Sequence, residues 1–280
     1  MTNSQCITDW YNQNATLEHD RLNACRLEFS ISMRKPLKIL DLGGGTGRYA
    51  VELTRKGHSV TLVDISQSEL DIAKCFAAES GVTLDAIVQA DAKAIQLHTD
   101  KDDPKTVFAA SSYDMILCQG PMYHLEESER SKVLCTCATL LRPGGFLLIA
   151  FVTQYAHLRD IAQRDPARLA AEYDGFYREY LLSGKYTRNP SGAMHHTHVS
   201  EIKELFRTVD GLCTAQHTLG IILNRIVPCE GFLGGGLSSK LVTLPQKDYE
   251  LWVDVVMQFT DDEALLGNAD HLLAVAERRQ

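Results

Sequence analysis

Short apolar runs alternate with amphipathic stretches through the first half of the chain. Each run is typical of a buried strand, and together the runs cover residues 37–41, 59–64, 85–89, 113–118 and 146–152. In the stretches between them, apolar residues recur every three or four positions, which is the period of a helix. Strands that alternate with helices in this way predict an α/β fold with a mostly parallel sheet and right-handed crossovers.

Turn and capping residues mark the ends of the predicted helices. Gly57 is expected to end the first helix. Ser66 is expected to begin the second, because Glu69, three residues later, completes a capping box. A third helix near residues 129–141 is expected to stop at the turn Pro143–Gly145.

The pattern changes after residue 152. Residues 153–199 are rich in Tyr, His, Arg and Asp and predict a helical or irregular insertion. Residues 200–208 and a stretch near 246–265 are helix-like, whereas 211–221 and 271–277 are expected to be two closing strands. We expect these parts to complete one elaborated domain over residues 1–280 rather than to form a second domain.

The composition of the 280 residues is that of a soluble globular protein, with 45% hydrophobic and 23% charged side chains. No apolar run is long enough to cross a bilayer, and the first residues do not form a secretion signal. The formal net charge is −8 and there is no basic block, so a nucleic-acid partner is not expected. None of the eight cysteines forms a Cys-x-x-Cys pair, so no zinc ribbon or redox motif is expected. These features predict a reduced, cytoplasmic protein.

The strongest chemical signal is the glycine cluster Gly43-Gly44-Gly45-Thr46-Gly47, between the first predicted strand and the first predicted helix. Glycine lets the backbone turn tightly and approach a ligand, and the helix behind it presents free N–H groups and the positive end of its dipole. Asp64 closes the next strand, 21 residues after Gly43, where a carboxylate can accept hydrogen bonds from both hydroxyls of a ribose. The sequence therefore predicts a nucleoside-containing cofactor.

Two classes of cofactor compete for this loop. The spacing Gly45-x-Gly47-x-x-Ala50 satisfies the dinucleotide fingerprint, which keeps an NAD(P)-dependent oxidoreductase as an alternative. Asp41 favours S-adenosylmethionine, because a carboxylate at this position attracts the cationic amino acid end of that donor and repels a pyrophosphate. Asp91 follows the third strand, where it can accept from an adenine amino group, and the chain has no Tyr-x-x-x-Lys dyad for hydride chemistry.

The ordered set of motifs resembles the class I S-adenosylmethionine-dependent methyltransferases. The resemblance covers about residues 37–152 and rests on five segments: Ile39–Gly47, Val63-Asp64, Ala90–Ala92, Asp114–Gln119 and Leu141–Gly145. Gly120–Leu125, Arg188–Pro190 and residues 271–276 are further similar to a small-molecule branch that carries Gly-Pro-Leu-Tyr-His-Leu after strand four. The resemblance implies a Rossmann-like sheet of seven strands, with the last strand antiparallel and helices on both faces.

The resemblance also assigns residues to the methyl donor. Asp64 is expected to hold the ribose, Ile65 to pack on adenine, and Gln119 to begin the segment that faces the reacting methyl. The full set of expected donor contacts is Tyr11, Arg21, Asp41, Gly43, Gly44, Gly45, Asp64, Ile65, Asp91, Ala92, Gln119 and Gly120. The implied organisation is a helical segment over the donor (1–36), a donor-binding core (37–152), a substrate-side lid (153–199), and C-terminal helices with closing strands (200–280).

The expected activity is methyl transfer from S-adenosylmethionine to N, O or S of a small molecule, with S-adenosylhomocysteine as the other product. Tyr123, His124, Tyr155, His195 and His196 are the candidate acceptor residues, and His124 is the first candidate base if the acceptor is a hydroxyl. No acid or cysteine stands at ligand spacing from the histidines, so no metal is expected. We expect a monomer or homodimer. A non-catalytic donor-binding scaffold of the same fold is the other alternative.

Overall fold

The computed structural model describes residues 36–97, 108–188, 194–215 and 220–279. Tyr11 and Arg21, and with them nearly all of the predicted N-terminal segment, lie outside the described residues. The chain folds as two compact units. The first comprises the described parts of residues 1–120, 132–148 and 277–280, and the second comprises those of 121–131 and 149–276.

Four parallel strands form the centre of the first unit: β1 (Lys38–Leu42), β2 (Ser59–Asp64), β3 (Ala86–Gln89) and β4 (Tyr113–Cys118). β1 lies between β2 and β4, with Ile39 opposite Val60 on one side and Met115 on the other. β2 in turn pairs with β3. Because all four strands point the same way, the residues that follow them meet at one edge of the sheet.

Amphipathic helices connect these strands. The helices are α3 (Arg48–Arg55) and α4 (Gln67–Glu79), followed by a short 3-10 helix η2 (Ala92–Ala94). Apolar side chains of both helices are buried: Ala50, Val51 and Leu53 from α3, and Leu70, Ala73 and Ala77 from α4. The Ser66 hydroxyl accepts a hydrogen bond from the backbone of Glu69, so Ser66 caps α4 as predicted. The reciprocal bond of a capping box does not form, because the Ser66 backbone N–H donates to Asp64.

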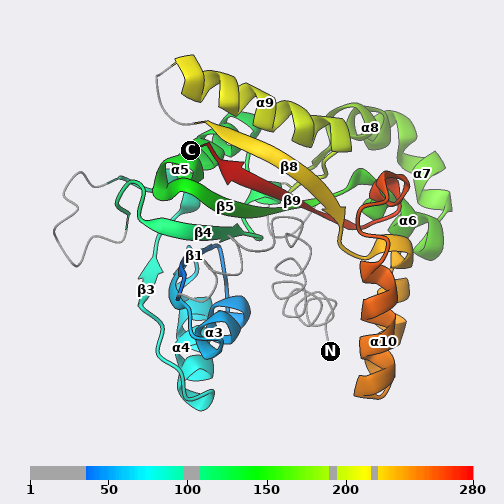
Figure 1. The fold of residues 1–280 in the computed structure, drawn as a ribbon. Helices are drawn as coiled ribbons and strands as arrows, with labels where there is room; N and C mark the ends of the chain where they lie inside the picture. The colour runs from blue at the N-terminus through cyan, green and yellow to red at the C-terminus, as the bar shows by residue number, and fades with distance from the viewer. Residues whose placement is uncertain (1–35, 98–107, 189–193, 216–219, 280) are drawn as a thin grey trace. The chain divides into compact units, whose positions relative to one another are not determined.

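The complete sheet has seven strands in the order β3-β2-β1-β4-β5-β9-β8. The added strands are β5 (Leu141–Val152), β8 (Ile221–Pro228) and β9 (His271–Arg278). Figure 1 shows β9, the last strand of the chain, running against its neighbours. The predicted fold class, a mostly parallel seven-stranded sheet with an antiparallel last strand, is therefore confirmed.

The second unit contains helices and short strands beyond β5. The helices of its first half are α6 (Gln154–Arg164), α7 (Ala167–Glu172), a single-turn π-helix (Tyr173–Tyr177) and α8 (Arg178–Ser183). β6 (Lys185–Tyr186) then pairs antiparallel with β7 (Met194–His195). The later elements are α9 (Val199–Ala215), α10 (Gln246–Met257), and the 3-10 helices Gly231–Leu233, Leu237–Thr243 and Glu263–Gly267.

Two predicted boundaries in the later part of the chain are wrong. Residues 211–221 are not a strand, because α9 continues to Ala215 and the strand begins at Ile221. The apolar period of α9 explains its length, since Ile202, Phe206 and Val209 are all buried at helical spacing. The helical stretch near 246–265 is also interrupted, because α10 ends at Met257 and a 3-10 helix begins at Glu263.

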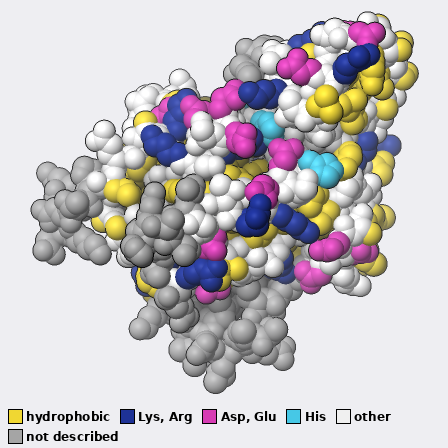
Figure 2. Space-filling view, turned by 90° about the horizontal axis from the view of Figure 1, so that it is seen from above, with side chains coloured by type: hydrophobic (Ala, Val, Ile, Leu, Met, Phe, Trp, Pro, Cys, Tyr) yellow, Lys and Arg dark blue, Asp and Glu magenta, His cyan; other side chains and the backbone are white. Residues whose placement is uncertain are grey.

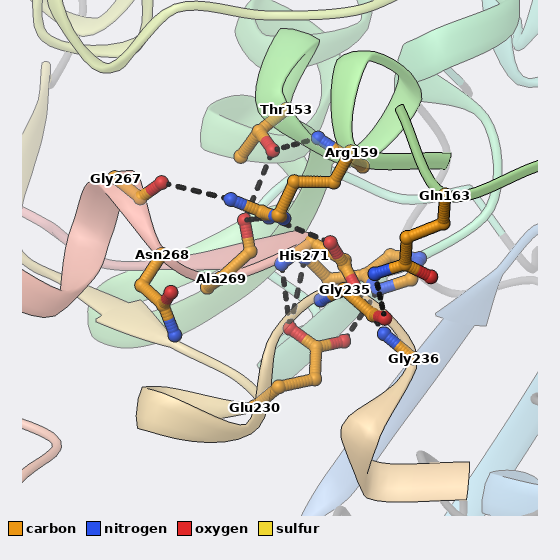
Figure 3. Close-up of polar contacts among 12 residues, drawn as sticks. Thr153, Arg159, Gln163, Glu230, Gly235, Gly236, Gly267, Asn268, Ala269 and His271 are labelled. Atoms are coloured by element: carbon orange, nitrogen blue, oxygen red, sulfur yellow. Dashed lines mark hydrogen bonds and ion pairs between the residues drawn. The ribbon is translucent and has the colours of Figure 1, made fainter. Parts of the chain in front are cut away.

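A polar network ties the loop before β9 to the rest of the second unit (Figure 3). Glu230 is buried and accepts three hydrogen bonds, from the backbone N–H groups of Asp270 and His271 and from the His271 ring. Asp270 binds Arg159 at 2.6 Å and accepts from the backbone of Gly235 at 2.8 Å. Arg159 also donates to the carbonyl oxygens of residues 267 and 269. Each carboxylate in this network therefore has a cationic partner.

Charged side chains of both signs lie on the described part of the surface that Figure 2 presents. Figure 2 shows acidic and basic side chains interspersed on the face that it presents, with histidines among them. None of the helices in the described part of the chain is long and apolar enough to cross a membrane.

Candidate functional site

The glycine cluster forms a tight loop directly after β1. Gly43, Gly45 and Gly47 have φ angles of 73°, 54° and 74°. Side chains other than glycine rarely adopt this left-handed region. The loop therefore needs glycine at three alternate positions, and α3 starts immediately behind it at Arg48.

Gly44 and Gly120 are required for a different reason, because a side chain added at either position would collide with neighbouring atoms. A Cβ at Gly44 would overlap the carboxylate of Asp41 and lie 2.5 Å from Leu62 Cδ1. A Cβ at Gly120, just after β4, would lie 2.7 Å from the carbonyl oxygen of Gly43. The two loops that follow β1 and β4 thus touch through backbone atoms, in the first unit, where Gly43, Gly44 and Gly120 were predicted to line a cofactor.

Asp64 fixes the shape of the loop from the end of β2. The residue is 9% exposed, and its two carboxylate oxygens accept hydrogen bonds from the backbone N–H groups of Gly45, at 2.9 Å, and Ser66, at 2.8 Å. A carboxylate has about four acceptor positions, so two remain for a ligand. Asp64 can therefore hold the loop and accept from hydroxyl groups at the same time.

Asp41 is a buried carboxyl with an unused oxygen. The residue is 1% exposed, and among the described residues its Oδ2 has no hydrogen-bond partner. Burial raises its pKa to about 7; the backbone N–H of Ala50 opposes this rise, and the charge of Asp64 adds to it. Gln119, after β4, also has a buried side-chain oxygen without a partner in the described chain. Such acceptors are costly unless a ligand satisfies them.

A third carboxylate lies beside the loop. A Cβ at Gly45 would overlap the side chain of Glu69, and partial burial together with the charge of Asp64 raises the pKa of Glu69. The nearby arginine, Arg48, packs on Phe76, with its Cζ atom 6.0 Å from the centroid of the ring. This arrangement suits a cation or a group that donates hydrogen bonds, and it opposes a phosphate.

The predicted adenine contacts lie at the same edge of the sheet. Ile65 directly follows β2 and is 64% exposed, which is unusual for a large apolar side chain beside a buried strand. Asp91 caps the helix η2 by accepting from the backbone of Lys93 at 3.1 Å, and Ala92 is the first residue of that helix. Asp91 is therefore the N-cap residue of η2, and the second oxygen of its carboxylate takes no part in the cap.

In the second unit, two of the candidate acceptor residues lie near each other. Tyr123 and His124 belong to a 3-10 helix (Met122–His124), with ring centroids 4.7 Å apart. His124 and His195 line one small cavity, and partial burial lowers the pKa of His124. His195 is buried and its Nε2 lies 2.6 Å from the carboxylate of Glu201.

The other two candidates lie in different surroundings. His196 is buried in an aromatic cluster with His157, Tyr180 and Tyr186, and its Nδ1 lies 2.8 Å from the Tyr180 hydroxyl. Burial, with smaller contributions from His157 and His195, lowers its pKa to about 4. Tyr155 instead contacts His198, with its hydroxyl 3.1 Å from the ring Nε2. Neither residue lines the cavity that His124 and His195 share.

A larger pocket of about 1000 Å³ opens beside this cavity, within the second unit. It is lined by His195 and Glu201, by apolar side chains such as Phe151, and by Arg130 from the first turn of α5 (Glu127–Leu140). Sequence reasoning missed Arg130. A signal was present, because an arginine in the first turn of a helix opposes the helix dipole.

Metal ligands are not brought together by the fold in the described part of the chain. Within those residues, no group of three His, Cys, Asp or Glu side chains could hold a metal ion.

Comparison with known proteins agrees with this geometry. Residues 39–145 match the family model described as a methyltransferase domain. These residues contain the glycine loop and the three acids described beside it, Asp41, Asp64 and Glu69. A ubiquinone biosynthesis O-methyltransferase from Pectobacterium atrosepticum is 29% identical over 139 residues, which are 49% of this chain and 52% of that protein. A protein of the same name from Xylella fastidiosa is 30% identical over 155 residues, 54% of this chain and 55% of that protein. The chain thus spans about half the length of the curated relatives that it matches.

Solved structures extend the similarity of fold to most of the chain. A SAM-dependent methyltransferase from Methanosarcina mazei gives a TM-score of 0.52 at 19% identity, covering 87% of this chain and 92% of that one. The 1,6-didemethyltoxoflavin-N1-methyltransferase from Burkholderia thailandensis, solved with S-adenosylhomocysteine, gives 0.50 at 15% identity, covering 89% and 74%. The similarity of fold therefore extends well beyond residues 39–145.

Proposed function

We propose that this chain is an S-adenosylmethionine-dependent methyltransferase that acts on a small-molecule acceptor. The observation that carries the proposal is the glycine loop after β1, flanked by the buried carboxyls of Asp41 and Asp64, in the fold of S-adenosylmethionine-dependent methyltransferases. The unused oxygen of Asp41 and the free acceptor positions of Asp64 fit the ammonium and the ribose hydroxyls of this donor. The donor supplies a methyl group on a cationic sulfur.

The chain's own contribution is to bind and to orient. The backbone can approach the ligand closely at four glycines, Gly43, Gly44, Gly45 and Gly120. Asp41 and Gln119 offer acceptors toward it. Ile65 offers an exposed apolar face for a base, and Asp91 and Ala92 lie at the end of the third strand. Holding two reactants in line can lower a barrier by roughly 7–11 kcal/mol without a charged intermediate on the protein.

The two alternatives from the sequence are less well supported. A nicotinamide dinucleotide would bring a pyrophosphate beside Asp41, Asp64 and Glu69, where Coulomb repulsion opposes it. A buried carboxyl without a partner supports binding of a donor, so the donor-binding scaffold is separated from the methyltransferase by transfer of the methyl group and not by binding. Since the curated relatives are named O-methyltransferases and one solved neighbour is an N1-methyltransferase, oxygen and nitrogen are the acceptor atoms to test first.

Binding of the spent donor tests the proposal directly. The purified chain is titrated calorimetrically with S-adenosylhomocysteine and, in a separate cell, with NADH. We expect micromolar binding of S-adenosylhomocysteine and no heat from NADH, followed by transfer of a labelled methyl group to a component of a metabolite extract. Binding of NADH alone would support the oxidoreductase, and donor binding without any transfer would support the scaffold.

His124 is the candidate base for a hydroxyl acceptor. Partial burial lowers its pKa, so the ring is neutral and able to take a proton throughout the neutral range. Replacing His124 with glutamine is expected to lower kcat about 100-fold and to remove the rise of the rate with pH at the acidic end. The measurement is the pH–rate profile of both proteins. His58→Gln serves as the control, because burial also lowers the pKa of His58, which lies in the first unit. A pH–rate profile of His124→Gln equal to that of the wild type would contradict the role of His124 as the base.

A further inference from the structure

The pocket of about 1000 Å³ in the second unit has the size of a small-molecule site. Its volume is at the upper end of the roughly 300–1,000 Å³ range that such sites occupy. Apolar side chains form part of its wall, namely Phe151, Leu182 and Leu205, and hydroxyl groups form another part: Ser128, Ser131, Thr197, Ser200 and Thr208. A ligand with an apolar body and polar ends would therefore find matching surfaces.

Arg130 is a charged group in this wall that the fold does not satisfy. The residue is 7% exposed, and its guanidinium has no hydrogen bond or ion pair with any described side chain. Its Nε is fully buried without a partner, and burial lowers its pKa. A buried cation without a partner lowers stability, and its place in the first turn of α5 adds an unfavourable interaction with the helix dipole. The fold alone therefore gives no reason for an arginine here.

The glutamates of the pocket do not neutralise Arg130 by contact, because three of the four have other partners. Glu126 binds Lys185 at 2.8 Å, Glu201 binds His195 at 2.6 Å, and Glu204 binds Arg207 at 2.7 Å. The fourth, Glu127, is exposed and makes no ion pair within the described chain. Arg130 interacts with Glu126, Glu127 and Glu201 only through space, and their negative charges raise the pKa of its guanidinium. The guanidinium thus remains charged and free to receive a ligand.

We propose that this pocket binds a small molecule through a carboxylate held by the guanidinium of Arg130. A planar carboxylate matches the fork of an arginine. A doubly charged phosphate would be repelled more strongly by the four surrounding glutamates. The apolar part of the ligand packs on the wall that contains Phe151 and Leu205. This proposal is independent of methyl transfer, because every residue that carries it belongs to the second unit.

Benzoate and its uncharged analogue benzamide are the probes for this site. Each is titrated into the full chain and followed by ligand-observed NMR and by the shift in Tm. We expect benzoate to bind at least 10-fold more tightly than benzamide in the wild type. In Arg130→Met, which removes the charge but keeps an unbranched side chain, we expect equal binding of the two. Arg130→Lys should keep part of the preference, since it keeps the charge and loses the fork.

Matched variants separate this proposal from its alternatives. Lys132→Met removes an exposed cation of the same helix that does not line the pocket, and it should bind benzoate as the wild type does. Asp64→Ala should also keep benzoate binding, so that a failed donor site leaves this test intact. Equal binding of benzoate and benzamide by the wild type would overturn the proposal. Absence of benzoate binding at millimolar concentration, or a preference for benzoate that survives in Arg130→Met, would do the same.

Discussion

Replacing Asp64 with alanine is expected to weaken the binding of S-adenosylhomocysteine by about 100-fold or more. Under the proposed function the carboxylate accepts from the ribose hydroxyls, and each hydrogen bond to a charged group contributes about 1.5–3 kcal/mol. The same side chain also holds the backbone of Gly45 and Ser66, so its loss loosens the loop that faces the ligand. Isothermal titration calorimetry of the two proteins measures the difference.

Asp85→Ala is the matched control for this substitution. Asp85 is an exposed aspartate just before β3, the strand that pairs with β2, and it lies at the amino end of that strand rather than at the carboxyl end. Its removal should leave the affinity unchanged. A circular dichroism spectrum and Tm for each variant separate loss of binding from loss of fold. Affinity in a folded Asp64→Ala variant equal to that of the wild type would contradict the assignment of the donor site.

The second large effect is on stability, at the Glu230–His271 pair of the second unit (Figure 3). Replacing Glu230 with alanine is expected to lower the free energy of unfolding by about 3–5 kcal/mol, the usual cost of removing one partner of a buried ion pair. Three hydrogen bonds end on this carboxylate, so the variant leaves two backbone N–H groups and an imidazole without their acceptor. Urea unfolding at 25 °C measures the loss.

This pair also gives the stability a pH dependence of defined sign. Burial opposes ionisation of both groups, yet their mutual attraction lowers the pKa of Glu230 and raises that of His271. The contribution of Glu230 is present above its ordinary pKa of 4.5 and is lost as the pH falls through the lowered value. The contribution of His271 is present below its ordinary pKa of 6.5 and is lost as the pH rises through the raised value.

The pair is therefore most stabilising between these two ordinary pKa values, and the difference between wild type and Glu230→Ala should be largest near pH 5.5. Glu263→Ala removes an exposed glutamate of the same unit and should change stability by less than about 0.5 kcal/mol at every pH. A loss below about 1 kcal/mol in Glu230→Ala, or the same loss at pH 5.5 and pH 9, would contradict this account of the network.

The parts of the fold that follow from local chemistry could be predicted from the sequence. Glycines at positions 43, 45 and 47 need a left-handed backbone, and that need identifies the loop before any contact is known. The order of apolar runs identifies the parallel strands, because each buried strand is short and is bounded by a cap or a turn. Ser66 marked the start of α4 for the same reason.

The errors arose where local pattern and tertiary context disagree. The true strand 221–228 contains Asn224 and Arg225, which interrupt its apolar pattern, and the predicted strand therefore lay too early in the chain. Side-chain surroundings were harder to predict than strands. His195 and His196 are adjacent in sequence, yet one pairs with Glu201 and the other is buried against Tyr180. His195 is the last residue of β7 and His196 follows the strand, and sequence alone does not say which elements cover each side chain.

Asp41 links the proposed donor to the acidity of the surroundings. With a pKa of about 7, the carboxyl is partly protonated at neutral pH when no donor is bound. An ammonium group beside it favours the ionised form, so capture of the donor expels that proton. Affinity should then increase as the medium becomes more alkaline up to about pH 7 and level off above it. A mild acid load would reduce occupancy of the proposed donor site without any change in the supply of the donor.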